Sequence, residues 1–148
     1  MTIFFYKYRI KEMNLTKVDK QKIIHKLQKF LSEELEIVFA YLHGSFLNED
    51  EFKDIDIALC LDEKTANKID LVASEITWSL RLEKYLFVPV DVKIINGSPL
   101  NFRYHVTRGY LLLCRDDLKR EEFLCKTWSE YFDFKPVSKI YLREIFIA

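Results

Sequence analysis

The segment Asp54-Ile-Asp-Ile-Ala-Leu-Cys-Leu61 restricts the possible folds of this chain more than any other segment. Side chains alternate between the two faces of a β-strand, so every second residue lies on the same face. One set of alternate residues is wholly aliphatic and consists of Ile55, Ile57, Leu59 and Leu61. The other set is Asp54, Asp56, Ala58 and Cys60. The segment therefore predicts a strand with one face in the core and two carboxylates side by side on the other face.

The spacing of apolar residues predicts further helices and strands around this segment. Strands are expected over 37–42, 87–95 and 110–114, and helices over 17–34, 64–85 and 117–132. A capping pattern at Thr16 and Asp19 marks the start of the first helix. A short helix is expected between Ser98-Pro99 and Gly109. This order of elements, without a Pro- or Gly-rich break, predicts one mixed-sheet α/β domain over 1–148, with a core at about 17–134.

The helical patterns also predict which side chains are buried. In the helix at 64–85 the expected buried stripe is Ile69, Val72, Ile76 and Leu80. In the first helix, a lysine face is expected to be solvated and consists of Lys20, Lys22, Lys26 and Lys29. A short apolar tail, residues 135–148, is expected after the last helix.

Composition excludes some classes of protein. The chain has 23 basic and 23 acidic residues, so it lacks the basic excess of a protein that binds nucleic acid through phosphate contacts. Cys60, Cys114 and Cys125 show no CxxC spacing, which favours reduced thiols and a cytoplasmic protein over zinc ligands or disulfides. The apolar run before Lys7 is too short for a signal peptide or a membrane span. Residues 1–13 are either an extra strand or the product of a misassigned start upstream of Met13.

A third carboxylate occupies an equivalent place on another predicted strand. Asp91 and Lys93 lie opposite the valine face of 87–95. Carboxylates gathered on one sheet repel one another unless a cation lies between them, and hard oxygen ligands suit Mg²⁺. A pair of such ions can hold the attacking and the leaving oxygens of a displacement at phosphorus. Gly44-Ser45, after a buried strand, would let backbone amides approach an anion such as a triphosphate.

These motifs together resemble a known family. The strongest matches are Tyr41-Leu-His-Gly-Ser-Phe46, Asp54-Ile-Asp-Ile-Ala-Leu59 and Val90-Asp-Val92. Weaker matches are Gly109-Tyr-Leu-Leu-Leu113 and Tyr131-Phe-Asp-Phe-Lys-Pro136. The chain resembles the minimal, single-domain branch of the DNA polymerase β-like nucleotidyltransferase superfamily, which implies a small mixed sheet flanked by helices.

The resemblance also implies roles for individual residues. Gly44 and Ser45 would cradle the β and γ phosphates of ATP, and Asp54 and Asp56 would bind two Mg²⁺ ions. Asp91 would complete the catalytic metal site near the attacking hydroxyl. The implied reaction is transfer of AMP from ATP to a protein hydroxyl, with the chain acting as the antitoxin of a HEPN-type toxin.

The loop after Gly44-Ser45 departs from the family pattern of a basic residue and a glycine. It carries Glu49, Asp50 and Glu51, and Lys53 is its only cation and a further candidate for nucleotide binding. The acidic residues favour an alternative, a catalytically weak binding module that neutralises a partner by occlusion.

Several residues keep two interpretations. His43 either assists proton transfer or packs under the loop, and Lys93 either touches phosphate or is a plain surface residue. An aromatic cluster near the end of the chain belongs to the core or to an interface with a partner or a second copy, and consists of Trp128, Tyr131, Phe132 and Phe134.

Overall fold

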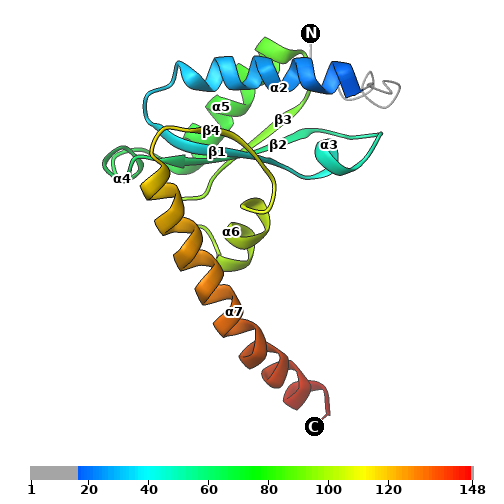
Figure 1. Cartoon of the computed structure of the whole chain (residues 1–148), viewed down its shortest axis with the longest axis vertical. Coiled ribbons are helices and arrows are strands. Elements are labelled where there is room, and N and C mark those ends of the chain that lie inside the picture. Colours follow the sequence, from blue (N-terminus) through cyan, green and yellow to red (C-terminus); the bar gives the residue numbers. More distant parts are fainter. Residues whose placement is uncertain (1–16, 148) are drawn as a thin grey trace.

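The computed structural model describes residues 17–147, which form a four-stranded mixed sheet with helices on both faces (Figure 1). The strands are β1 (Ile37–His43), β2 (Ile55–Leu61), β3 (Val90–Ile94) and β4 (Tyr110–Cys114). Their order in the sheet is β3-β2-β1-β4. β1 is antiparallel to both β2 and β4, whereas β2 and β3 are parallel. The predicted α/β class and mixed sheet are confirmed.

The helices form one layer on each face of the sheet. They are α2 (Lys17–Ser32), α3 (Ser45–Asn48), α4 (Glu63–Ala66), α5 (Leu71–Leu86), α6 (Leu100–Val106) and α7 (Asp117–Ile147). Figure 1 shows α2 and α5 on one side of the sheet and α6 and α7 on the other. The capping residue proposed for α2, Thr16, lies outside the described residues.

Two sets of buried side chains match the alternation predicted for β2. The aliphatic set is at most 1% exposed and packs with α2 and α5 in the larger cluster, which includes Leu27, Trp78 and Leu82. Ala58 and Cys60 pack on the opposite face, in a smaller cluster that includes Phe39. Burial of one large aliphatic side chain contributes about 1.5–3 kcal/mol, so the register of β2 is strongly fixed.

The helix predicted over 64–85 is two helices, α4 and α5, and the stripe predicted to be buried on it is wrong. The four residues are exposed by 36%, 65%, 57% and 49%, in the order Ile69, Val72, Ile76 and Leu80. The buried residues of α5 are Trp78 and Leu82 instead.

Hydrogen bonds to the edge strand β3 explain why α5 turns a different face toward the sheet than predicted. Glu75, Ser79 and Glu83, four residues apart, accept hydrogen bonds from the backbone N–H groups of β3. The pairs are Val90 N to Glu83 Oε1 at 3.1 Å, Val92 N to Ser79 Oγ at 3.0 Å and Ile94 N to Glu75 Oε1 at 2.9 Å. Backbone donors at a sheet edge need partners, and here a helix supplies them through its side chains.

The last helix, α7, does not end near 132 as predicted. It continues to Ile147 and projects from the rest of the molecule (Figure 1). Residues 133–147 contain no glycine, the residue that most often ends a helix. Pro136 lies inside the helix, although an interior proline removes a backbone donor and crowds the carbonyl group one turn earlier.

The three cysteines are free thiols. Cys60 is buried, and burial raises the pKa of its thiol to about 12. Cys114 is partly exposed and Cys125 exposed. None of the helices within residues 17–147 combines the length and the apolar character that a membrane crossing requires.

Candidate active site

Three adjacent strands bring the candidate residues together. Asp56 of β2 is in register with His43 of β1 on one side and with Asp91 of β3 on the other. Side chains of directly paired residues lie on the same face of a sheet. Asp54 comes just before β2 and shares this face by alternation. The structure therefore places the three predicted aspartates on the sheet face opposite the aliphatic core.

The charges of these carboxyl groups act on one another. The pKa of Asp56 rises from 3.8 to about 6, first because the group is half-buried and then because Asp54 and Asp91 are negative. A cation between the three groups would remove this repulsion. Asp91 itself is about half-exposed, with 49% of its side chain accessible to solvent.

The turn at Gly44 lies directly against Asp56. Gly44 has φ 82° and ψ −161°, a conformation that is essentially restricted to glycine. A Cβ atom at this position would overlap Oδ2 of Asp56. Helix α3 begins at the next residue, Ser45. The structure thus brings the predicted phosphate cradle and the predicted metal ligands into contact.

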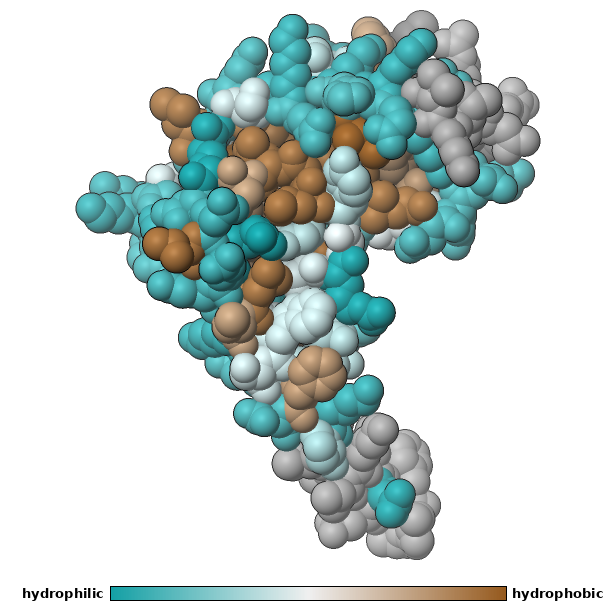
Figure 2. All heavy atoms as spheres, viewed as in Figure 1, coloured by the Kyte–Doolittle hydropathy of each residue, from teal (hydrophilic) through white to brown (hydrophobic). Residues whose placement is uncertain are grey.

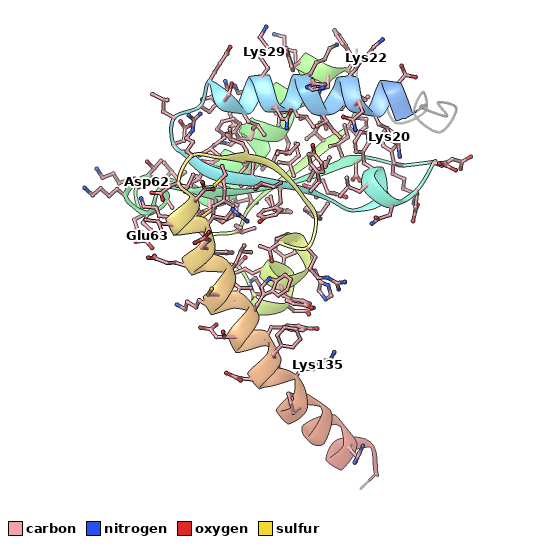
Figure 3. The ribbon with its side chains drawn as sticks, viewed as in Figure 1. Lys20, Lys22, Lys29, Asp62, Glu63 and Lys135 are labelled. Atoms are coloured by element: carbon pink, nitrogen blue, oxygen red, sulfur yellow. The ribbon has the colours of Figure 1, made fainter. Side chains whose placement is uncertain are left out.

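The acidic loop is held by a residue that was predicted to be solvated. Lys20 of α2 donates hydrogen bonds of 2.7 Å to the carbonyl oxygens of both Phe46 and Glu49. In Figure 3, Lys20 lies on the side of α2 that faces the sheet, whereas Lys22 and Lys29 point away from it. A sequence signal existed, because Lys20 is spaced like the buried Ile24, Leu27 and Leu31 on one helical face.

Two further lysines and one histidine were also candidate site residues. Lys93 Nζ lies 4.0 Å from Asp91 Oδ1 and 3.8 Å from Glu75 Oε2, so it neighbours the aspartates. Lys53 is exposed in the loop that joins α3 to β2. The ring of His43 packs edge-on against Phe102 of α6, with centroids 5.9 Å apart. Burial lowers the pKa of His43, against an opposite effect of Asp91, so the packed interpretation is favoured.

The donor set suits Mg²⁺ in type but does not form a closed cage. Within the described part of the chain, no group of three or more His, Cys, Asp or Glu side chains is arranged to hold a metal ion. The aspartates instead offer an open set of carboxylate oxygens whose mutual repulsion shows in the raised pKa of Asp56. Mg²⁺ commonly binds one or two carboxylates and keeps water and substrate phosphate as its other ligands. The residues present therefore fit such an ion.

Tyr104 of α6 contacts three rings of the aromatic cluster, those of Trp128, Tyr131 and Phe132, the last edge-on with centroids 5.8 Å apart. Tyr131 stacks on Tyr104 of α6, with centroids 3.7 Å apart, and Trp128 Nε1 donates to Thr107 Oγ1 at 3.0 Å. These two residues hold α7 against α6. Phe132 and Phe134 remain 52% and 59% exposed. The space-filling view shows apolar side chains gathered below the α2 layer, and apolar and polar side chains next to one another along the part of α7 nearest the sheet (Figure 2).

Comparison with known proteins identifies a family and several solved structures with a similar fold. The family model for polymerase beta nucleotidyltransferases matches residues 25–118. No curated protein matches the chain. A solved structure of the tri-AMPylated HEPN toxin of Shewanella oneidensis with its MNT antitoxin contains a chain that is 21% identical, with a TM-score of 0.66. The similarity covers 86% of this chain and 98% of that one.

Two further solved structures are similar at the same level. One is the toxin-antitoxin pair MntA-HepT, at 20% identity and a TM-score of 0.65, with coverage of 85% of this chain and 98% of the other. The second is a toxin-antitoxin complex with AMP-PNP, at 20% identity and a TM-score of 0.67, with coverage of 83% and 98%. At such identities these likenesses establish a shared fold.

Proposed function

The chain belongs to the polymerase beta nucleotidyltransferase family, and we propose that it transfers AMP from ATP to a hydroxyl group of a HEPN-type protein, with Mg²⁺ as cofactor. The observation that carries the proposal is the convergence of Asp54, Asp56 and Asp91 beside the Gly44 turn. The similar solved structures include one with an AMPylated HEPN toxin and one with AMP-PNP, which supports this choice of nucleotide and partner.

Each residue has a separate task in the proposed reaction. Gly44 and Ser45 bind the terminal phosphates, and Lys53 is a further candidate contact for them. Asp54 and Asp56 provide oxygen ligands, and Asp91 lies next to the attacking hydroxyl. Mg²⁺, when bound, neutralises charge between the carboxylates and the triphosphate and stabilises the leaving pyrophosphate. The hydroxyl oxygen attacks the α-phosphorus and gives its proton to the neighbouring Asp91 carboxylate or to water, a new P–O bond forms, and the bond to pyrophosphate breaks.

A protein is the acceptor that suits the molecule best. Asp91 is half-exposed on an edge strand, so an acceptor group can reach it from solvent. A cavity of about 940 Å³ lies toward the other end of β2, with Leu61, Asp62 and Asn96 in its lining and none of the three aspartates, so it does not enclose a small acceptor beside them. The net charge of zero gives no support to RNA capture. A protein acceptor brings its own surface, and exposed Phe132 and Phe134 on α7 offer it an apolar contact.

Intact-mass spectrometry tests the proposal. The HEPN-type partner is incubated with this chain, ATP and Mg²⁺, and a mass increase of one or more AMP groups is expected. A reaction with Asp54→Asn in place of the native chain is the control and should leave the mass unchanged. No mass increase with the native chain would contradict AMP transfer.

A second candidate function is occlusion of the partner without catalysis. The exposed Glu49, Asp50 and Glu51 favour it, because they place negative charge near the turn that would bind a triphosphate. Tight binding of the HEPN-type partner, measured by calorimetry without any mass increase, would support occlusion over transfer.

A further inference from the structure

We propose that Lys20 is a positioning residue for nucleotide binding, because it ties helix α2 to the segment that follows the Gly44–Ser45 turn. The inference rests on the proposed function in one respect, which is that this turn contacts the triphosphate.

The tie consists of two short hydrogen bonds from one ammonium group. Lys20 Nζ lies 2.7 Å from the carbonyl oxygen of Phe46 and 2.7 Å from that of Glu49. These carbonyls belong to the end of α3, a four-residue helix. Carbonyl groups at a helix end have no partner within the helix, and a cation there is favourable. Lys20 therefore closes the end of α3 from a different element of the fold.

Two aromatic rings confine the same ammonium group. Nζ lies 5.3 Å from the ring centroid of Phe46 and 5.8 Å from that of Phe52. The two rings are packed edge to face, 4.8 Å apart, and are only 1% and 4% exposed. The hydrogen bond to Phe46 is partly buried beside these rings, whereas the one to Glu49 is exposed. Both involve a charged donor, and hydrogen bonds to charged groups are stronger than neutral ones. The segment is thus fixed near its start by Phe46 and near its end by Phe52.

This tie acts on the turn through a short length of chain. Gly44 is two residues before Phe46, and its backbone lies against Asp56 Oδ2. A shift of Phe46 would therefore move the turn relative to the aspartates. Fixing the segment holds the turn where a phosphate and the carboxylates can meet.

The positive charge of Lys20 also matters, because the loop after the turn is acidic. Residues 44–53 contain Glu49, Asp50 and Glu51, and Lys53 is the single cation among them. A loop with this charge repels a triphosphate. Lys20 brings a positive charge to the start of this loop. Its hydrogen bond to the carbonyl oxygen of Glu49 also fixes the position of the first acidic residue. The segment directly after the Gly44–Ser45 turn contains no cation of its own before Lys53. Lys20 of α2 supplies a positive charge there instead.

The test compares two lysines of the same helix. Lys20→Met removes the hydrogen bonds and the charge, whereas Lys22→Met removes the same charge from an exposed position that points away from the sheet (Figure 3). Binding of AMP-PNP with Mg²⁺ is measured by calorimetry. We expect Lys20→Met to weaken binding roughly tenfold, the effect of about one charged hydrogen bond, and Lys22→Met to change it less than about twofold. Lys20→Arg keeps the charge and the donors and should restore most of the affinity.

Hydrogen exchange at the amides of residues 44–49 gives a second measurement that needs no nucleotide. Faster exchange in Lys20→Met than in Lys22→Met is expected, with recovery in Lys20→Arg. Equal exchange in the two methionine variants would overturn the tie, even if the native chain bound no nucleotide. Faster exchange with unchanged AMP-PNP affinity would overturn the positioning role. Absence of AMP-PNP binding by the native chain would count against the proposed function and therefore also against this role, while the exchange data would still decide whether the tie exists.

Discussion

At the scale of single residues, Asp56 is the group that depends most on its surroundings. Its pKa is raised from 3.8 to about 6 by burial and by Asp54 and Asp91. A folded state with the higher pKa binds more protons than the unfolded state between these values. The stability of the metal-free protein should therefore fall as the pH rises from about 4 through 6.

Asp56→Asn should remove this pH dependence. Without metal, the variant should melt at an equal or higher temperature than the native chain at pH 7.5, and the difference should shrink toward pH 4. Transfer of AMP should fall by more than about a hundredfold, because a charged ligand at the reaction centre is lost. Thermal melts in a chelator across pH 4–8 provide the measurement.

The exposed Asp50 is a suitable control for this variant. Asp50→Asn removes one exposed carboxylate and should change the melting temperature little. A lower melting temperature of Asp56→Asn at every pH would mean that Asp56 is a structural residue.

Gly44 is the second residue at which a substitution should have a large effect on both stability and nucleotide binding. Alanine there meets an unfavourable backbone conformation, which costs about 1–3 kcal/mol, and its Cβ overlaps Asp56 Oδ2. Gly44→Ala should therefore lower the free energy of unfolding and abolish AMP-PNP binding.

Gly97 is the matched control for Gly44. It also has a positive φ, 72°, but an added Cβ would meet nothing within 4 Å. Gly97→Ala should cost stability through the backbone alone and leave AMP-PNP affinity intact. Urea unfolding and calorimetry on both variants would separate the two effects, and equal losses of affinity would contradict a special role of Gly44.

At the scale of elements, the alternation of β2 made the site predictable. Because the aliphatic set must be buried, Asp54 and Asp56 had to share the other face, and the same reasoning placed Asp91. Gly44 and Ser45 stood out as a turn after a buried strand, and the family resemblance assigned them to the β and γ phosphates. Lys20 was assigned to the solvated face because it is charged, although its helical spacing matches that of the buried residues. Its partners are backbone carbonyls of Phe46 and Glu49, which the sequence does not mark as acceptors.

The errors on α5 and α7 have different physical causes. Apolar spacing showed where α5 could bury residues, but the unpaired donors of β3 selected a different face. Glu75, Ser79 and Glu83 were needed there as acceptors, and Ile76 turned outward as a result. The helix predicted to end near 132 continues through Pro136 to Ile147, and no glycine within 133–147 ends it.

The contact between α5 and β3 can be tested at Ser79. Ser79→Ala would leave the N–H of the buried Val92 without its acceptor, which costs about 1–3 kcal/mol. Thr77→Ala is the control, because the Thr77 hydroxyl bonds only within its own helix, to the carbonyl oxygen of Ala73. It should change the free energy of unfolding by less than about 0.5 kcal/mol. Urea unfolding would measure both, and equal effects would contradict the edge role of Ser79.

At the scale of the whole molecule, α7 gives the chain its asymmetric outline (Figure 1). Its first half is fixed to α6 by Trp128 and Tyr131, and Phe132 and Phe134 are exposed where it leaves the core. If the proposed partner contacts this region, the double variant Phe132→Ser, Phe134→Ser should weaken partner binding at least tenfold.

Binding of AMP-PNP should be unchanged in this double variant, since neither residue lies near the aspartates. Leu118→Ser is the control, because Leu118 is 72% exposed at the opposite end of the same helix. Calorimetry with the HEPN-type partner would decide the matter. Native affinity in the double variant would place the partner elsewhere on the surface.

The side chains of α5 that cover β3 also limit how copies of this molecule can join edge to edge. The sheet has β3 at one edge and β4 at the other. The outward donors of β3 are already bonded, so a strand from a second molecule finds no template there. Among residues 17–147, β4 pairs with β1 alone, so pairing through β4 would use that edge of both molecules at once. Such association closes at two copies and does not propagate, which removes one route from a partly unfolded chain to a fibre.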